Sequence, residues 1–203
     1  MKTKETIFES ALYLFSEQGF NAVTIRQITK RAGVTPGAFY NHFASKDELL
    51  QAVYDFYTRQ FIQPQESADA IAGYERFLTQ HGPVALFEHI THSYFQPMHN
   101  EKLLRLTKII LMEQYTNATA GEIAFRDRQC LLKSMETLFT LMDKLKYIRV
   151  KDPQYTGRLL GYVYLGFSAD NIYSYFLEGK DPEEIASRQL ETVMRFLDDI
   201  LIH

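Results

Sequence analysis

The strongest constraint on the fold is a series of helix-end signals between Thr24 and Pro36. Thr24 is followed by Gln27 in the spacing of a capping box at a helix N-terminus. Gly33 stands where a helix commonly ends, because glycine adopts the left-handed conformation at little cost. Thr35 can cap a second helix, and Pro36 fits its first position, where the missing N–H is not needed. The stretch therefore predicts two short helices joined by a tight turn.

The apolar spacing and the charge of this stretch indicate a nucleic-acid role. Ile25, Ile28 and Ala32 give the first helix a narrow apolar stripe. No Asp or Glu occurs from Thr24 to Lys46. The layout predicts a helix-turn-helix, whose second helix enters the major groove of DNA. The alternative for its positive charges is a solvated face without a partner. These charges are Arg26, Lys30, Arg31 and Lys46.

Composition excludes several other classes of protein. The chain has 203 residues, of which 46% are hydrophobic, so it can bury a substantial core. Because the net charge is −3, the positive charge must be local. Cys130 is the only cysteine, which excludes a disulfide framework and a thiolate metal cluster. Glu5 and Glu9 argue against a signal peptide, and apolar runs such as 161–169 are too short to span a bilayer. We therefore expect a soluble cytoplasmic protein with no membrane association, no metal and no cofactor.

The hydrophobic periodicity predicts an all-α protein in two parts, and no alternating strand pattern occurs. Residues 1–46 are expected to form a three-helix helix-turn-helix DNA-binding domain, followed by a linker helix at 45–62. Pro64 ends that helix and marks the boundary to a helical body for effector binding and dimerisation, residues 63–203. The other helices are expected at 2–18, 67–80, 83–94, 100–116, 119–145, 153–177 and 182–202.

The last two expected helices favour a dimer interface. The helix at 153–177 is apolar on nearly every side, and such a helix must be buried all round. Its own core and a second subunit would provide that cover. Gly157 and Gly161 leave room for a close helix approach. We therefore expect a homodimer in which these two helices form half of a four-helix interface. The stripe on the last helix consists of Ile185, Gln189, Val193, Phe196 and Ile200.

The N-terminal part resembles the DNA-binding head of the TetR family of one-component transcriptional regulators. The rest resembles that family in architecture alone, an all-helical body ending in two helices that suit dimerisation. The resemblance implies a homodimer that binds a palindromic operator in double-stranded DNA, usually as a repressor that a small molecule releases. The matching residues are Ala11, Phe15, Gly19, Phe20, Thr24, Ile28, Ala32, Gly33, Val34, Gly37, Tyr40, His42, Phe43, Lys46 and Leu49.

The resemblance also implies which residues touch the DNA backbone. By position, Lys46 and Tyr40 resemble the family's phosphate contacts, with His42 and Thr24 in supporting roles. Two alternatives stay open from the residues themselves. Tyr40 could belong to the core, although its neighbours Phe39 and Phe43 fit that role better, and His42 could equally brace the helix end.

The second helix carries few long polar side chains that could read bases. Thr35, Gly37 and Arg26 fall where base or near-base contacts usually lie in the family. We expect base reading to depend on these residues together with Tyr40 and Asn41, including backbone approach at Gly37.

The body is expected to hold a small, largely apolar effector of unknown identity. Sites for small molecules are mostly apolar with a few placed polar groups. Glu113 is the most suggestive polar candidate, because it follows Ile109 and Ile110 on the apolar side of its helix. Each candidate could instead be ordinary core, and Glu113 could be a carboxylate at a frayed helix end or paired with an arginine. The candidates are Phe87, Ile90, Leu106, Ile109, Ile110, Glu113, Met135, Phe139, Met142, Phe167 and Asn171.

Two other functions remain as alternatives. The first is a regulator of the same kind that has no effector and acts through a protein partner bound to its body. The second is an enzyme, which the sequence disfavours because it offers no nucleophile–base pair and no phosphate-binding glycine loop. Glu88, His89 and His92 are poorly arranged for a metal, and Glu88–His92 fits a surface pair better. Cys130 is better explained as an unreactive side chain packed on an apolar face than as a redox sensor.

Overall fold

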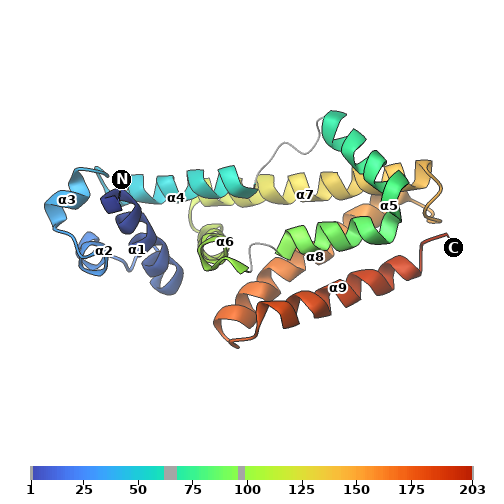
Figure 1. The fold of residues 1–203 in the computed structure, drawn as a ribbon. Helices are drawn as coiled ribbons and strands as arrows, with labels where there is room; N and C mark the ends of the chain where they lie inside the picture. The colour runs from blue at the N-terminus through green and yellow to red at the C-terminus, as the bar shows by residue number, and fades with distance from the viewer. Residues whose placement is uncertain (1, 62–67, 96–98, 203) are drawn as a thin grey trace. The chain divides into compact units, whose positions relative to one another are not determined.

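The computed structural model describes residues 2–61, 68–95 and 99–202, and it is all-α, as the sequence predicted (Figure 1). Helices account for about 81% of the described residues. Within the described ranges, the only β feature is an isolated antiparallel bridge between Ile148 and Leu201. The helices are α1 (Lys2–Gln18), α2 (Ile25–Ala32), α3 (Pro36–Tyr40), α4 (Lys46–Phe61), α5 (Ala68–Phe95), α6 (Glu101–Glu113), α7 (Ala118–Lys144), α8 (Pro153–Phe176) and α9 (Pro182–Asp198).

These helices form two compact units that divide the chain differently from the two expected domains. The first unit comprises Met1–Gln63 and Asn100–Arg126, and the second comprises Pro64–His99 and Asp127–His203. Helix α6 therefore packs with the N-terminal helices, although the sequence placed it in the body. The expected boundary around Pro64 lies outside the described residues.

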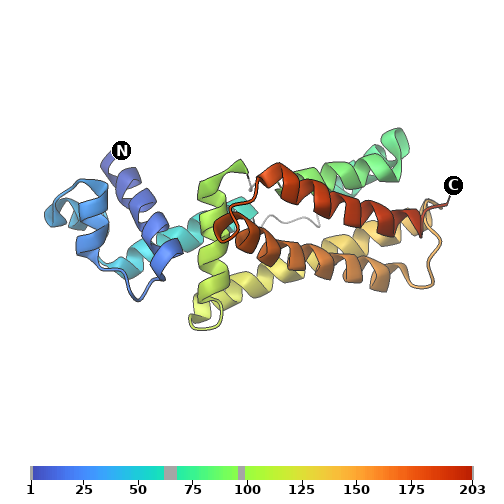
Figure 2. The same cartoon turned by 90° about the horizontal axis from the view of Figure 1, so that it is seen from below.

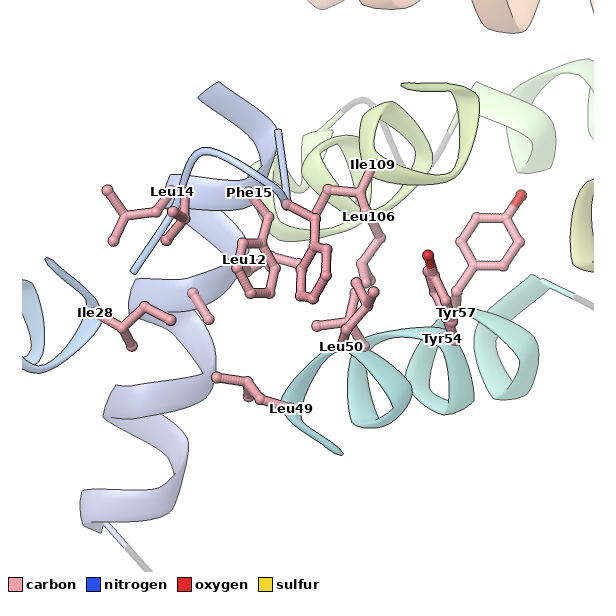
Figure 3. Close-up of a cluster of buried hydrophobic side chains, with 14 of the residues drawn as sticks. Leu12, Leu14, Phe15, Ile28, Leu49, Leu50, Tyr54, Tyr57, Leu106 and Ile109 are labelled. Atoms are coloured by element: carbon pink, nitrogen blue, oxygen red, sulfur yellow. The ribbon is translucent and has the colours of Figure 1, made fainter. Parts of the chain in front are cut away.

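Helix α6 joins the first unit because its apolar side chains complete that unit's core. Phe15 of α1, Leu50 of α4 and Leu106 of α6 converge there (Figure 3), and each is at most 4% exposed. Fully burying such a side chain contributes about 1.5–3 kcal/mol. The core also includes Ile28 of α2 and Phe39 of α3, so the two short helices are fixed to the same cluster.

The second unit combines α5, the later part of α7, α8 and α9. Helix α5 is broken at Gly82, whose φ of 79° and ψ of 173° are not helical, so it consists of two segments. This break separates the two helices that the sequence predicted at 67–80 and 83–94. The first residue of that prediction, Ser67, lies outside the described residues. Helices α8 and α9 run side by side (Figures 1 and 2). The buried cluster of this unit includes Phe87, Phe139, Tyr164 and Val193.

Helices α8 and α9 differ in how they relate to the expected dimer interface. Helix α8 buries one face within its own unit, through Leu160 and Tyr164 among others, and leaves the opposite face exposed. On α9, the expected interface stripe is turned inward. Ile185, Gln189 and Val193 are at most 2% exposed within the subunit, so they cannot also cover a partner. The part of the dimer expectation that rests on the α9 stripe is therefore wrong.

Helix α9 ends at Asp198 rather than at Ile202, because the chain turns to pair with the segment after α7. The N–H of Arg149 donates to the carbonyl of Ile200, and the N–H of Ile202 donates to the carbonyl of Tyr147, both at 2.9 Å. None of the described helices combines the length and apolar composition needed to cross a membrane.

Candidate nucleic-acid interface

The helix-turn-helix is built by the local signals that the sequence contains. At the start of α2, the Thr24 hydroxyl accepts from the N–H of Gln27 at 3.3 Å, while Gln27 Oε1 accepts from the N–H of Thr24 at 2.7 Å. Gly33 ends α2 with a φ of 67°, and Thr35 Oγ1 accepts from the N–H of Ala38 at the start of α3. The two threonines expected at the DNA therefore already serve as helix caps.

Helix α3 presents a small outward surface with one large side chain. Tyr40 is 57% exposed, whereas Phe39 beside it is fully buried and packs edge-on against the Tyr40 ring, with centroids 5.4 Å apart. The structure thus places Tyr40 outward rather than in the core. Gly37 and Asn41 are also exposed, and His42 is half-buried. The exposed part of α3 offers one phenol, one amide and an accessible backbone.

The cations of the helix-turn-helix fall into two groups. Arg26 and Lys30 are exposed on α2, and neither forms a salt bridge with any described residue. The Arg31 guanidinium instead lies over the Tyr13 ring of α1, 3.4 Å from its centroid. Arg26 and Lys30 are therefore the cations of α2 best placed for a polyanion.

Lys46, which the resemblance implies is a phosphate contact, also makes contacts within the head. Its ammonium donates to the carbonyl oxygens of Phe20 and Val23, both at 2.8 Å, and lies 4.1 Å from the centroid of the Phe20 ring. An ammonium has three N–H donors, so two are used within the protein. In this structure Lys46 braces the connection between α1 and α2.

The effector candidates do not come together in one site. Leu106, Ile109 and Ile110 are buried in the core of the first unit. Glu113, also in that unit, is 8% exposed and accepts a hydrogen bond from the N–H of Phe20 at 3.3 Å. Glu113 is therefore buried at the end of α6, and it forms no salt bridge with an arginine among the described residues.

The remaining effector candidates belong to the second unit. Phe87, Met135, Phe139 and Met142 are buried in its core, and Ile90 and Phe167 pack partly buried against it. The Asn171 side chain accepts a hydrogen bond from Gln189 Nε2 at 2.8 Å. Several of these residues thus share one cluster.

A hollow of about 110 Å³ in the second unit is lined by none of the predicted pocket residues. It contains Glu88 and His92, yet no group of three metal-binding side chains occurs among the residues that the structure describes. Its lining is Glu88, Thr91, His92, His99, Glu183, Ala186, Ser187 and Leu190.

One functional feature escaped the sequence analysis, a network that ties α6 to α1. The Arg105 guanidinium donates to Glu17 and Glu101 at 2.7 Å and lies 4.4 Å from the centroid of the Tyr13 ring. The Arg105 hydrogen bond is the main reason why the pKa of Glu17 lies below its ordinary value. The Glu101–Arg105 pair has the local i,i+4 spacing, but no local signal could have revealed the link to Glu17, which lies 88 residues from Arg105.

The geometry of this head agrees with a comparison of the sequence against protein families. The model of bacterial regulatory proteins of the tetR family matches residues 7–53, which run from α1 into α4. The head of this chain, residues 7–53, is a TetR-family DNA-binding domain. Members of this family are transcriptional regulators rather than enzymes.

Curated regulators resemble this chain over segments of similar length. The uncharacterised regulator YerO of Bacillus subtilis is 43% identical over 54 residues, which are 27% of this chain and 19% of YerO. The TetC protein of transposon Tn10 from Escherichia coli is 48% identical over 52 residues, 26% of each chain. UidR of E. coli is 36% identical over 66 residues, 32% of this chain and 30% of UidR. The matched region thus spans less than a third of these relatives.

Solved structures match over nearly the whole chain. NalD, the secondary repressor of the MexAB-OprM multidrug efflux pump in Pseudomonas aeruginosa, has a TM-score of 0.65 at 25% identity, covering 96% of this chain and 94% of NalD. A TetR regulator from Haloarcula marismortui has a TM-score of 0.67 at 16% identity and covers 98% of both chains. These likenesses extend the shared fold beyond the head to the helical body.

Proposed function

We propose that this protein is a homodimeric transcriptional regulator that binds a palindromic operator and is released from it by a small, largely apolar effector. The observation that carries the proposal is the exposed face of the capped helix-turn-helix, where Arg26, Lys30 and Tyr40 point to solvent. Cations facing phosphates release counterions, which drives association with DNA.

Each exposed group of the head has a definite task in this proposal. Arg26 and Lys30 neutralise phosphates, and Arg26 also reaches toward a base edge. Tyr40 and Asn41 contribute hydrogen bonds to phosphate or base, and Gly37 lets the backbone of α3 approach the groove. Thr24, Thr35 and Lys46 act mainly by holding the two helices, because their polar atoms are already engaged there.

The proposed dimer is supported by the outer face of α8. Its exposed side chains recur at alternating intervals of four and three residues, the spacing of a helix-packing seam. Tyr155, Leu159, Tyr162 and Tyr173 are between 45% and 59% exposed. Exposed apolar patches of this kind mark interaction sites. The outer α8 face consists of Tyr155, Leu159, Tyr162, Gly166, Ala169 and Tyr173.

The proposed effector site is confined to the second unit. Residues Leu106, Ile109, Ile110 and Glu113 are committed to the core of the first unit, so they are poor candidates for ligand contact. Ile90 and Phe167 are better candidates, because they border the second core without being fully buried. NalD, similar over nearly its whole length, is a repressor, which favours repression here.

A selection from random double-stranded DNA tests the proposal. The wild-type protein should enrich a palindromic sequence and bind it with an affinity that falls steeply with salt. Arg26→Ala should weaken binding about 10- to 100-fold, the equivalent of one lost charge-assisted hydrogen bond. Fluorescence anisotropy with the enriched sequence measures both effects.

The matched control is Arg195→Ala on α9. It removes an arginine that is 79% exposed and that, among the described residues, pairs only with Glu191. It should leave DNA affinity unchanged. Failure to enrich any sequence, or equal losses in the two variants, would contradict the proposal. Lys46→Ala is a poorer test, because it also removes two hydrogen bonds within the head.

A further inference from the structure

The ammonium of Lys4, near the start of α1, lies against the segment that directly follows α3, the second helix of the helix-turn-helix. Its Nζ atom is 5.3 Å from the centroid of the Phe43 ring. Phe43 is 3% exposed, whereas Lys4 is exposed. A cation over an aromatic ring is attracted by the electron-rich face of that ring. Phe43 therefore restrains the position of the ammonium while the lysine stays accessible to solvent.

Phe43 also connects Lys4 to the outward surface of α3. The helical turn continues past the end of α3, because the N–H groups of His42 and Phe43 both donate to the carbonyl of Phe39, at 2.9 and 3.0 Å. The Phe39 ring packs against the Phe43 ring, with centroids 5.9 Å apart, and edge-on against the Tyr40 ring at 5.4 Å. One aromatic cluster thus holds both the exposed Tyr40 side chain and the Lys4 ammonium.

The positive charge of Lys4 is not neutralised by an ion pair. Lys4 forms no salt bridge with any residue that the structure describes. Glu48, in the first turn of α4, instead accepts a hydrogen bond from the N–H of Ala44. Lys46 directs two of its three N–H donors to backbone carbonyls. Lys4 therefore offers a polyanion more unused donors than Lys46 does.

We propose that Lys4 binds a phosphate of the operator beside the groove that α3 enters, and that the Phe43 ring holds the ammonium in place for this contact. The inference rests on the proposed DNA-binding function and adds a contact from α1, a helix to which the sequence gave no role at the DNA. An ammonium that is already held loses less conformational entropy on binding. Because the contact is to the DNA backbone, it strengthens binding without selecting bases.

The salt dependence of operator binding tests this contact. Each phosphate contact contributes about 0.9 to the slope of log affinity against log salt concentration. Lys4→Gln should therefore reduce the slope by about 0.9 per head, or about 1.8 for a dimer with both heads bound. At about 0.1 M salt the same relation gives an affinity roughly five- to tenfold weaker per head. Fluorescence anisotropy at several salt concentrations measures the slope and the affinity.

A purely structural role of Lys4 would give a different pattern. A distorted head would bind more weakly by the same factor at every salt concentration, and the slope would not change. That result would overturn the proposal, as would wild-type affinity in Lys4→Gln. Lys4→Arg keeps the charge and can stack on the ring, so it should retain the wild-type slope. A reduced slope in Lys4→Arg would also contradict the phosphate contact.

The matched control is Lys133→Gln on α7. Lys133 is an exposed lysine of the second unit, and it too forms no salt bridge within the described part of the chain. The substitution changes the net charge as much as Lys4→Gln does, so it measures the effect of overall charge. It should leave the slope unchanged. Equal reductions in the two variants would overturn the assignment to Lys4.

Uncharged phosphate analogues locate the contact on the DNA. A methylphosphonate replaces one phosphate oxygen by a methyl group and removes the negative charge. Placed in turn along one strand of the operator, it should weaken wild-type binding at the phosphate that Lys4 contacts. At that position it should not weaken Lys4→Gln further, because the partner is already absent. Equal penalties for both proteins at every position would overturn the contact.

Phe43→Leu tests the role of the ring. It keeps an apolar side chain but removes the attraction for the ammonium, so affinity should fall about two- to fivefold. The slope should be retained, because the charge of Lys4 is still present. In the Lys4→Gln background the same substitution should have no further effect on affinity. Equal losses in both backgrounds would overturn the positioning by Phe43.

The wild-type measurement separates this inference from the function on which it rests. A wild-type protein without salt-dependent, sequence-specific binding would contradict the proposed function and the Lys4 contact together. Salt-dependent wild-type binding with the same slope in Lys4→Gln would overturn the Lys4 contact alone.

Discussion

Single residues determine how closely α7 and α8 approach each other. A Cβ atom added to Gly157 would lie 2.4 Å from the carbonyl oxygen of Met135, and one added to Gly161 would lie 2.8 Å from Leu132 Cδ2. The first contact involves backbone, which cannot yield as a side-chain tip can. The sequence indicated a close helix approach at these glycines, and the structure shows that it occurs within the subunit.

We therefore predict that Gly157→Ala destabilises the protein more than Gly161→Ala. Overpacking of this kind typically costs about 1–3 kcal/mol. Gly73→Ala is the control, because nothing lies within 4 Å of its added Cβ. It should instead stabilise α5 by about 0.5–1 kcal/mol. Urea denaturation followed by circular dichroism measures all three, and an equally stable Gly157→Ala would contradict the close approach.

Residues whose role is local were predictable, and those whose role depends on distant partners were not. The helix-capping roles of Thr24, Gly33 and Thr35 can be predicted from neighbours within a few positions. Lys46 finds its acceptors more than twenty residues away, and Glu113 finds its donor 93 residues away. Sequence spacing carries no information about such contacts, so neither the Lys46 nor the Glu113 hydrogen bonds could be predicted.

At the scale of elements, α6 is attached to α1 by charge as well as by its apolar face. Arg105 is 11% exposed in its side chain and binds Glu17, Glu101 and the Ser16 hydroxyl. The guanidinium groups of Arg105 and of Arg31 on α2 both lie over the Tyr13 ring. Three helices of the first unit thus share one network at its surface.

This network predicts an acid-sensitive contribution to stability. The pKa of Glu17 is lowered from 4.5 in the folded protein, chiefly by the Arg105 hydrogen bond. The stabilisation is therefore complete above about pH 4.5 and is lost as the pH falls through the lower folded value. Glu17→Gln should flatten the dependence of the urea midpoint on pH over this range.

The size of that effect is limited by solvent. Glu17 is 37% exposed in its side chain, so the loss in Glu17→Gln at neutral pH should be within about 1 kcal/mol. Glu5→Gln, on the same helix and without a salt bridge among the described residues, should follow the wild-type profile. An identical pH profile in Glu17→Gln would show that the ion pair does not stabilise the fold.

Helices α8 and α9 show what a hydrophobic pattern can and cannot predict. The period of α8 gave its length correctly, but a helix that is apolar on every side does not reveal which face its own core takes. On α9, the stripe through Ile185 and Val193 was recognised, yet the same stripe suits an internal core and a subunit interface equally. Choosing between them requires the packing of the other helices.

At the scale of the whole molecule, the proposed function requires two heads to be joined for DNA binding. A palindromic operator presents two half-sites, and one short recognition helix with few base-reading side chains gains specificity from the fixed spacing of two copies. The outer α8 face defined above is the surface that we propose for this assembly.

We predict that Leu159→Glu combined with Tyr162→Glu converts the protein to monomers. Two buried carboxylates at an apolar seam would be desolvated without partners, which strongly disfavours association. Sedimentation velocity should show the change, and operator affinity should fall with it. Thr192→Glu on the exposed face of α9 is the control and should remain dimeric. A double variant that still sediments as a dimer would exclude the outer α8 face as the interface.

The discontinuity of the first unit has a consequence for how the protein is made. Its core needs Leu106 and Ile109, so the head cannot be completed when only the residues up to Gln63 have left the ribosome. At roughly 5–20 residues per second, synthesis from there to Arg126 takes about 3–13 s. During this interval Leu50 and Phe15 lack part of their cover. The nascent helix-turn-helix is therefore a natural client for a chaperone, and it becomes able to bind DNA only after α6 has emerged.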